Sequence, residues 1–506
     1  MIEDAVEVPD GTQIDCDLCI VGGGMAGLAI ARELRERELD VVVLEGGGAT
    51  PEPDSQALYE GNATLHDGSG GTHDLGAFLH ESRLRCLGGS GNLWGAKCAV
   101  LDESDFAKRE WMPESGWPFT RADLAPFYDR ACDLLRVPRF DYDPASEFDA
   151  GRPPLVVGEG TRSTTATRHL SPVRGGPGTA LDEYKRAATD GERVQVFLHA
   201  SALELEAEGT GTRVESIRVG TLRGNRFHVH ARAFVLAAGG IENARLLLAS
   251  TGASPKGLGN AHDLVGRFFS NHTTFGPGAA LGFTRPTESL DLYTTRDPQR
   301  IWGVLALSRA AQERERAPNF TVTMGPADEP PTTDDTDVVT AAALADGGFA
   351  RDGDTPAPPV PAYFMLEQRL NPESRLTLSE ERDALGLPRV RLDWRFTAED
   401  EDGMRRGVRA FARELGAAGQ GRVRCEWPEK SPVQEYSHSR HHIGTTRMHP
   451  DPRHGVVDAD ARVHGVANLW IAGSSIFPTP GIANPTLTIV ALALRLADHL
   501  ARELAQ

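Results

Sequence analysis

The residues of this chain best suited to chemistry gather in one short stretch near its C-terminal end. Residues 441–448 read HHIGTTRM, so His441 and His442 stand side by side before a glycine, two threonines and Arg447. Imidazole titrates near neutral pH and is also a common metal ligand. The stretch is therefore compatible with an acid–base site, a metal site or a polar turn.

The metal alternative depends on four histidines within SHSRHHIGTTRMH, namely His438, His441, His442 and His449. The segment has no H-E-x-x-H spacing and no nearby set of cysteines, which are the patterns that hold zinc in many proteins. We therefore predict that this stretch binds no metal.

A cofactor site is predicted near the N-terminal end, where a strand, a tight turn, a helix and a second strand follow one another between residues 15 and 45. Gly22, Gly24 and Gly27 form G-x-G-x-x-G at the junction of strand and helix. These glycines allow the turn, the close approach of a pyrophosphate and tight helix packing. Glu45 ends the second strand, 18 residues after Gly27, where a carboxylate accepts ribose hydroxyls. The motif leaves open whether the dinucleotide is NAD or FAD.

Further elements are indicated along the chain. A β-rich block runs over residues 194–236 and is followed by a helix, and TAED at residues 397–400 predicts a capping box that opens a helix ending near Leu415. A last helix is expected after Pro485. Residues 326–360 are rich in Pro, Asp, Thr and Gly, which predicts a long flexible surface loop.

The composition excludes several functional classes. The 506 residues carry a net charge of −19, which argues against nucleic-acid binding and against an anionic membrane surface. No apolar run is long enough for a membrane span, and the N-terminal residues have no signal-peptide pattern. Six cysteines are too few for a disulfide scaffold, and we interpret Cys16 and Cys19 as core residues of a strand. We expect a cytoplasmic protein.

Several stretches resemble the glucose–methanol–choline oxidoreductases. They include GGSGNLWGA at residues 88–96, NLWIAGSSIFPTPGIANPTLTIVALALRLADHL at residues 468–500, and HHIGTTRM itself. The resemblance extends to WMPESGWPFTRADLAPFYDRA, FVLAAGGIENARLLLAS and EQRLNPESRLTL, so it covers most of the chain except residues 140–190 and 326–360. The motifs are most similar to those of the pyranose-oxidising branch.

The resemblance implies that the cofactor is FAD. It assigns the ADP half to the G-x-G-x-x-G turn and Glu45, and it places two further loops and Ala238 near the remainder of the cofactor. The implied contacts in these loops are Gly89, Ser90, Asn92, Leu93, Trp94, Gly473, Ser474, Pro485 and Thr486.

One departure from the family pattern concerns how the FAD is held. Some members carry a histidine in the GGS loop that bonds covalently to the flavin. This chain has Leu93 before Trp94, and leucine cannot alkylate the ring. We therefore expect FAD to be bound non-covalently.

The resemblance also decides between the two histidines. The catalytic histidine of the family stands three residues before the glycine of the GT pair, so Gly444 selects His441. The second catalytic position, a histidine or an asparagine, corresponds to Asn484 in GIANPT. The imidazole can take the hydroxyl proton and the amide can hold the alcohol oxygen. His442 is expected to orient its neighbour, and Arg447 to brace the loop.

We accordingly predict an α/β fold in which a Rossmann-like FAD-binding domain is interleaved with a substrate domain built from a sheet and helices. The FAD-binding domain is predicted at residues 10–50, 80–100, 191–270 and 436–506, and the substrate domain at residues 51–79, 101–190 and 271–435.

The predicted function is FAD-dependent oxidation of an alcohol, with a ring hydroxyl of a sugar or glycoside converted to a keto sugar. The electron acceptor, oxygen or a quinone or protein, is left open. Two alternatives remain at this point: a dehydrogenase acting on a primary alcohol of an amino sugar or polyol, and a non-oxidative lyase on the same fold.

Overall fold

The structure is a computed structural model of the whole chain. It describes residues 1–93, 97–137, 160–168, 180–190, 192–275, 279–283, 293, 301–324, 351–352, 355–356, 360–425 and 437–505. Trp94 and most of the predicted loop at residues 326–360 lie outside these ranges. Within that loop, β16 (Arg351–Asp352) and β17 (Thr355–Pro356) pair with each other.

The first sheet contains the predicted βαβ unit. Its strands run in the order β1-β8-β3-β2-β11-β10-β9, and β23 pairs with β11. The pairs from β1 to β11 are parallel, as is β11 with β23, whereas β11-β10 and β10-β9 are antiparallel. The strands are β1 (Ile2–Asp4), β2 (Gln13–Val21), β3 (Val41–Leu44), β8 (Val194–Leu198), β9 (Ser201–Ala207), β10 (Val214–Gly220), β11 (Arg226–Leu236) and β23 (Leu469–Ile471).

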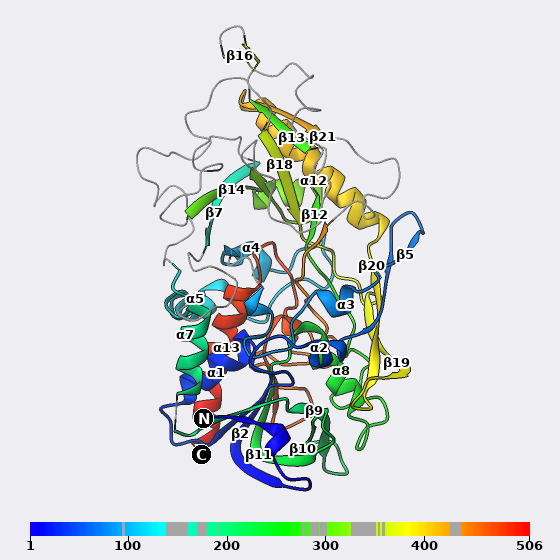
Figure 1. Cartoon of the computed structure of the whole chain (residues 1–506). Coiled ribbons are helices and arrows are strands. Elements are labelled where there is room, and N and C mark those ends of the chain that lie inside the picture. Colours follow the sequence, from blue (N-terminus) through cyan, green and yellow to red (C-terminus); the bar gives the residue numbers. More distant parts are fainter. Residues whose placement is uncertain are drawn as a thin grey trace.

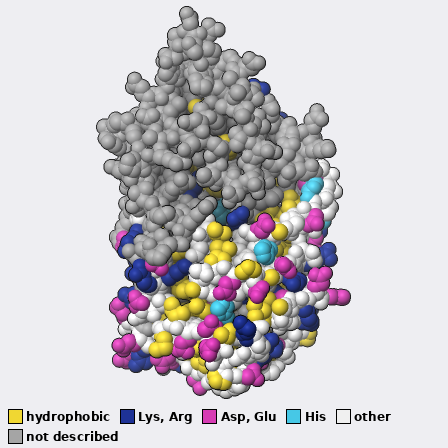
Figure 2. All heavy atoms as spheres, viewed as in Figure 1, with side chains coloured by type: hydrophobic (Ala, Val, Ile, Leu, Met, Phe, Trp, Pro, Cys, Tyr) yellow, Lys and Arg dark blue, Asp and Glu magenta, His cyan; other side chains and the backbone are white. Residues whose placement is uncertain are grey.

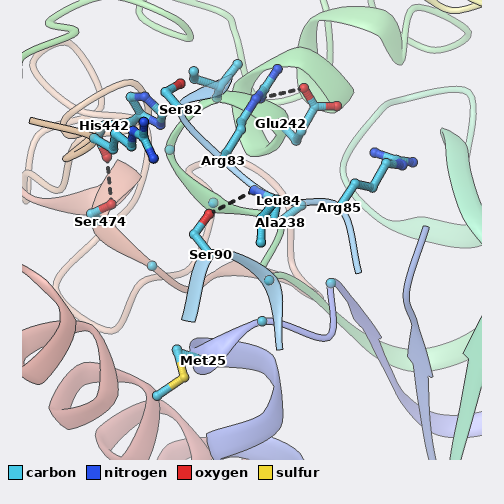
Figure 3. Close-up of a pocket in the computed structure, with 18 of the residues that line it drawn as sticks. Met25, Ser82, Arg83, Leu84, Arg85, Ser90, Ala238, Glu242, His442 and Ser474 are labelled. Atoms are coloured by element: carbon cyan, nitrogen blue, oxygen red, sulfur yellow. Dashed lines mark hydrogen bonds and ion pairs between the residues drawn. The ribbon is translucent and has the colours of Figure 1, made fainter. Parts of the chain in front are cut away.

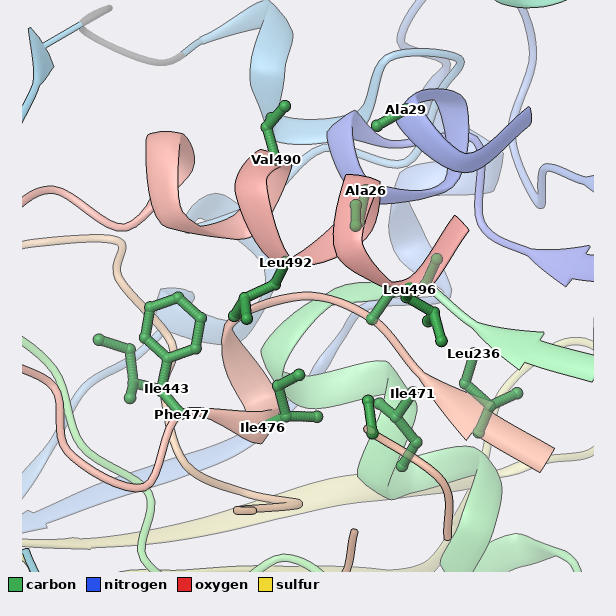
Figure 4. Packing of buried hydrophobic residues seen from close by; sticks show 14 of the residues in the cluster. Ala26, Ala29, Leu236, Ile443, Ile471, Ile476, Phe477, Val490, Leu492 and Leu496 are labelled. Carbon is green, nitrogen blue, oxygen red and sulfur yellow. The ribbon is translucent and has the colours of Figure 1, made fainter. Parts of the chain in front are cut away.

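Helices cover this sheet because each carries an apolar stripe that must be buried. α1 (Met25–Leu34) and α13 (Thr486–Leu504) pack against each other, and Figure 1 shows them on one side of the sheet with α5 (Arg121–Leu135) and α7 (Ala180–Thr189). Figure 4 shows Leu496 of α13 directed toward Ile471 of β23, whereas Val490 points away from that strand. The predicted first and last helices of the chain are thus confirmed.

The second sheet stands at the opposite end of the molecule, and both termini lie beside the first sheet (Figure 1). Its order is β21-β13-β18-β15-β14-β7-β6, and β12 joins β18 to β22. The strands are β6 (Lys97–Cys98), β7 (Thr161–Arg168), β12 (Thr273–Phe275), β13 (Ala279–Phe283), β14 (Ile301–Leu307), β15 (Phe320–Met324), β18 (Val360–Leu366), β21 (Gly421–Cys425) and β22 (Ser437–His438).

Helix α12 (Ala398–Ala417) packs against this sheet, and α10 (Arg309–Glu315) packs against α12. The Phe411 ring of α12 meets Phe320 and Phe364 edge-on at centroid distances of 6.2 and 6.0 Å. The predicted capping box is confirmed: Thr397 Oγ1 accepts from Asp400 N at 3.2 Å, and Asp400 Oδ2 accepts from Thr397 N at 2.7 Å. This box begins the helix where the sequence predicts it.

The remaining elements connect the two sheets. A four-stranded sheet in the order β19-β20-β4-β5 runs along one side of the molecule, and α8 packs on β9 and β19. The elements are α2 (Pro53–Ala57), β4 (Gly61–His66), β5 (Thr72–Asp74), α3 (Phe78–Glu81), η2 (Gly89–Asn92), α4 (Glu103–Phe106), α8 (Gly239–Ala249), β19 (Arg375–Arg382), β20 (Pro388–Arg395), η1 (Ala5–Glu7) and η5 (Ser474–Ile476).

The predicted domain limits differ from this packing in one respect. Residues 101–190 are assigned to the substrate domain by the sequence, yet α5 packs against α13 and α7 packs against α1. The reason is physical: α5 buries Leu124, Tyr128 and Leu135, and α13 offers the apolar surface that covers them. These two helices therefore pack with the helices beside the first sheet, and the domain limits stay a prediction.

Cys16 and Cys19 lie in β2, as predicted, and neither forms a disulfide. Burial, above all, raises the pKa of Cys16 to about 12 and holds that of Cys19 well above its usual value. Both thiols are therefore protonated at neutral pH and serve as small core residues.

The surface carries charges of both signs. On the part of the visible face that is described, Figure 2 shows acidic and basic side chains interspersed, with apolar side chains near the middle of the molecule. Within the described ranges, no helix is long and apolar enough to cross a membrane.

Candidate active site

A cavity of about 820 Å³ opens where the carboxyl ends of β2 and β3 meet turns from distant parts of the chain. Ligands of open α/β sheets bind at such carboxyl ends, and this volume falls within the range of cofactor pockets. The walls include most of the predicted site residues: Gly22, Gly24, Glu45, Gly89, Ser90, Leu93, Ala238, His441, Gly473, Ser474, Asn484, Pro485 and Thr486.

The glycine turn forms the floor of the cavity. Gly22 has φ +110°, and a Cβ there would lie 2.6 Å from Ala237 O, whereas a Cβ on Gly27 would lie 2.0 Å from Gly22 O. A Cβ on Gly24 would meet no protein atom within 4 Å, so open space faces this residue. α1 begins directly after Gly24 with no side-chain cap, and Figure 3 shows Met25 at its first turn. Free N–H groups at a helix start favour a phosphate.

Glu45 is buried at the end of β3 and lines the cavity. Its Oε2 accepts from Gly23 N at 3.0 Å, and its Oε1 accepts from Gly47 N at 2.9 Å. Burial raises the pKa of Glu45, although both backbone donors and the Arg85 charge oppose that rise. Each carboxylate oxygen can accept a second hydrogen bond, so a ribose contact stays a prediction that this geometry permits.

The loop from Gly88 to Leu93 forms a second wall. Gly88 and Gly89 have φ of +91° and +53°, which suits glycine, and Ser90 Oγ accepts from Leu84 N at 3.2 Å (Figure 3). Asn92, predicted to contact the cofactor, does not line the cavity. Its Nδ2 donates to Gly89 O at 2.7 Å and to Leu87 O at 3.1 Å, so it braces the loop from behind.

The third wall comes from the C-terminal part of the chain. Gly473 has φ +114° and precedes η5, and Ser474 Oγ donates to His442 O at 2.6 Å. Pro485 stands at the N-cap of α13, where no side chain caps the helix. Figure 3 shows Ser474 and Ala238 facing the cavity from two different segments. Two uncapped helix starts, those of α1 and α13, thus border one space.

These residues fit FAD. An elongated dinucleotide needs backbone without side chains along its path, and a Cβ on Gly24, Gly239 or Gly473 would meet no protein atom within 4 Å. The described residues that would hold it are the glycine turn, Glu45, the Gly89–Ser90 loop and the Gly473–Ser474 turn. Bound there, FAD would supply the hydride-accepting chemistry that no side chain has.

Leu93 bears on how FAD is attached. It lines the cavity with 47% of its surface exposed, and its aliphatic side chain has no nucleophile. We expect acid denaturation followed by centrifugation to leave the yellow FAD in the supernatant. Colour that stays with the pelleted protein would contradict non-covalent binding, and absorbance of both fractions is the measurement.

His441 stands at the far end of the cavity, as the register through Gly444 predicts. Its Nε2 lies 3.3 Å from Asn484 Nδ2, and its Nδ1 lies 2.9 Å from Nδ1 of His272. Burial first, and then the His272 ring, hold the pKa of His441 well below the usual histidine value. At neutral pH the imidazole is therefore uncharged, and one of its ring nitrogens carries a lone pair that can accept a proton.

His442 has a different environment. Its ring lies edge-on to Phe78 at 5.6 Å and tilted against Phe269 at 5.9 Å, and burial lowers its pKa to about 3. Its backbone carbonyl accepts from Ser474, so the residue is held on both sides. These contacts support the prediction that His442 has an orienting role.

Arg447 braces the loop, as predicted. Its guanidinium is buried, donates to the Glu114 carboxylate at 3.2 Å and to the Glu114 carbonyl, and lies 4.4 Å from the centre of the Phe268 ring. Within the described ranges, no group of three His, Cys, Asp or Glu side chains could hold a metal ion.

Three residues of the site were missed by sequence reasoning. His272 contacts His441. Lys97 lines the cavity and, after burial and the neighbouring histidines, lowers the pKa of His441. Arg83 forms an ion pair with Glu242 at 2.8 Å in the cavity wall (Figure 3). None stands in a recognisable motif. A histidine in FFSNHTTF has no local signal, because only tertiary structure brings it beside His441.

Comparison with known proteins agrees with this geometry. Residues 371–493 match the family described as GMC oxidoreductase, and residues 17–84 match the family described as FAD dependent oxidoreductase. The chain is 27% identical to 6'''-hydroxyparomomycin C oxidase of Streptomyces lividus over 96% of its own length and 92% of the relative's. It is 37% identical to C-glycoside 3-oxidase of Arthrobacter globiformis over 24% of its length and 23% of the relative's.

Among solved structures, pyridoxine 4-oxidase from Mesorbium loti shares the fold with a TM-score of 0.56 and 21% identity, and the match covers 96% of this chain and 99% of that one. The matched regions contain the glycine turn at one end and Asn484 at the other, and both border the same cavity. The C-terminal part of the chain therefore matches the GMC oxidoreductases and the N-terminal part the FAD dependent oxidoreductases, and the chain is an FAD-dependent enzyme that acts on alcohols.

Proposed function

We propose that this enzyme oxidises a hydroxyl of a sugar or glycoside, with a ring hydroxyl converted to the keto group. The observation that carries the proposal is the pair of His441 Nε2 and Asn484 Nδ2. These atoms lie 3.3 Å apart and border the same cavity as the FAD-binding turns.

The two side chains divide the work on the alcohol. The substrate hydroxyl donates to His441 Nε2 and accepts from Asn484 Nδ2. His441 takes the hydroxyl proton. FAD held by the glycine turn and the Gly473–Ser474 turn would supply the hydride acceptor, so that the alcohol would lose two electrons and two hydrogens in total. The amide holds the oxygen while its negative charge develops, which is the stage at which a positioned donor helps most.

The histidine end of the cavity suits a polyhydroxylated ring. Thr274, Ser439 and Lys97 supply polar groups to the cavity lining, and Met365 supplies apolar surface. A sugar ring needs this mixture, since its hydroxyls seek hydrogen bonds while its C–H faces seek apolar contact. The relatives named for oxidation of a C-glycoside and of hydroxyparomomycin C support a sugar-like substrate.

Flavin bleaching without oxygen tests the substrate class. We expect glucose, xylose or an aryl glycoside to bleach the flavin absorbance under anaerobic conditions, whereas choline and cholesterol leave it unchanged. Choline would need an aromatic cage or a carboxylate for its ammonium group. Bleaching by choline or cholesterol alone would overturn the sugar assignment.

A second candidate is the primary alcohol of an amino sugar, because the paromomycin-related relative matches over nearly the whole chain. Product analysis separates the two: a ring hydroxyl yields a ketone and a primary hydroxyl yields an aldehyde. Lys97 near His441 and Arg440 near His442 place positive charge at the histidine end, which disfavours a substrate with several ammonium groups.

The electron acceptor belongs to the same proposal. The rates at which air and, in a parallel sample, a quinone reoxidise the bleached enzyme distinguish an oxidase from a dehydrogenase. Oxygen uptake by the purified enzyme with sugar would argue against a required partner protein. The cytoplasmic location expected from the sequence stays a prediction.

A further inference from the structure

His272 faces the side of His441 that is turned away from the substrate. The Nδ1 atoms of the two rings lie 2.9 Å apart, and the rings meet at 82°. We propose that His272 is a positioning residue that holds the proton of His441 on Nδ1, so that the Nε2 lone pair points at the substrate hydroxyl. The inference rests on the proposed function, in which His441 is the base.

The proton positions follow from donor and acceptor chemistry. His272 Nε2 lies 2.9 Å from Gly481 O, and a carbonyl oxygen can only accept, so Nε2 of His272 carries a hydrogen. In a neutral imidazole the other nitrogen is then an acceptor, so Nδ1 of His272 receives a hydrogen bond from Nδ1–H of His441. Nε2 of His441 is left bare and accepts from the Asn484 amide.

Both rings must be neutral for this assignment to hold. His272 is fully buried, and burial lowers its pKa to about 4, although the Gly481 carbonyl and the Glu367 charge oppose the shift. The pKa of His441 is lowered as well. At neutral pH each imidazole therefore carries one hydrogen, and the chain of hydrogen bonds has one consistent direction.

The two ends of this chain of hydrogen bonds lie in one loop of the polypeptide. Gly481 accepts from His272, and Asn484, three residues later, contacts His441. Gly481 N donates to Glu367 Oε1 at 3.0 Å, and Glu367 is held by both terminal nitrogens of buried Arg109 at 2.7 and 2.8 Å. The position of His272 relative to Asn484 is thus anchored to a buried ion pair.

The backbone next to His272 also holds His441. Asn271 Oδ1 accepts from His441 N at 3.0 Å, and the Asn271 amide donates to Ser439 O. Strand pairing sets this register, because Thr273 of β12 lies opposite His438 of β22 and Ser270 bridges to Ile443. Asn271 therefore holds the main chain of His441, and His272 holds its ring.

Two substitutions separate this role from simple packing. His272→Phe keeps a ring but removes the acceptor, while in His272→Asn the amide oxygen can take the place of Nδ1. By analogy with partners that orient a metal-bound histidine, we expect His272→Phe to lower the flavin-reduction rate about 10- to 100-fold. His272→Asn should recover most of it. KM for the sugar and the FAD content should change little in either variant.

Equal losses of the flavin-reduction rate in both variants, or a change in KM alone, would overturn the proposal. The tautomer itself is read by ¹⁵N-histidine NMR of the FAD-loaded enzyme, with the His441 signals assigned by their absence in His441→Ala. We expect Nδ1 of His441 to carry the hydrogen in the wild-type enzyme. A hydrogen on Nε2 would refute the inference even if a different alcohol proves to be the substrate, so the two proposals fail separately.

Discussion

His441→Ala is expected to slow flavin reduction by the sugar about 10²- to 10⁴-fold while FAD stays bound, because that is the usual contribution of a general base. The substrate hydroxyl then has no acceptor for its proton, and the Asn484 amide cannot replace it. FAD should be retained because the glycine turn and the Gly473–Ser474 turn are untouched. Stopped-flow absorbance of the flavin under anaerobic conditions measures the rate.

His442→Ala is the matched control, since it removes an adjacent ring of the same type. Its loss should be smaller per bound FAD, because the ring packs between Phe78 and Phe269 instead of meeting the Asn484 amide. This variant should instead lower thermal stability, as truncation of a buried aromatic side chain does. If the two rate losses were exchanged, the assignment of the base through Gly444 would be wrong.

Asn484→Ala is expected to slow the same step about 10²- to 10³-fold, or roughly 2.7–4 kcal/mol, by analogy with removal of one oxyanion-hole donor. The amide nitrogen lies 3.3 Å from His441 Nε2, so an alcohol oxygen beside the pair can lie within hydrogen-bond reach of both and accept from the amide. Alanine leaves the developing negative charge on that oxygen without this donor.

Asn484→His provides the control, because histidine restores an N–H donor at the position where some family members carry it. It should recover part of the rate that alanine loses. A rate for Asn484→Ala within a factor of two of wild type would show that the amide does not hold the oxygen. The melting temperature of each variant with FAD bound shows whether the substitution has disrupted the fold.

Local patterns were sufficient for the cofactor half of the site. Gly22 and Gly27 are dictated by backbone geometry within one turn, since a Cβ at either would collide with Ala237 O or Gly22 O. The strand before this turn and the helix after it follow from the periodicity of apolar residues over a short stretch. α13 was predictable for the same reason, because Pro485 and the apolar stripe both act within that segment.

Similar local reasoning placed Asn92 at the cofactor, and there the structure differs. Asn92 lies in the predicted loop, but its amide turns back to Gly89 O and Leu87 O, and Lys185 Nζ donates to its Oδ1 at 2.8 Å. A motif fixes the path of the loop, whereas the direction of one side chain depends on the partners around it. Lys185, from α7, could not be foreseen as such a partner.

The sequence by itself was sufficient to predict the FAD turn and to propose the pair His441 and Asn484. Only the tertiary structure decided which nitrogen of His441 faces the substrate. That choice depends on His272 and on the Gly481 carbonyl, which reach the base from two other segments through the pairing of β12 with β22 and the anchored loop at Glu367. The physical reason is that a neutral imidazole has two nearly equivalent tautomers, and hydrogen bonds from its surroundings select one.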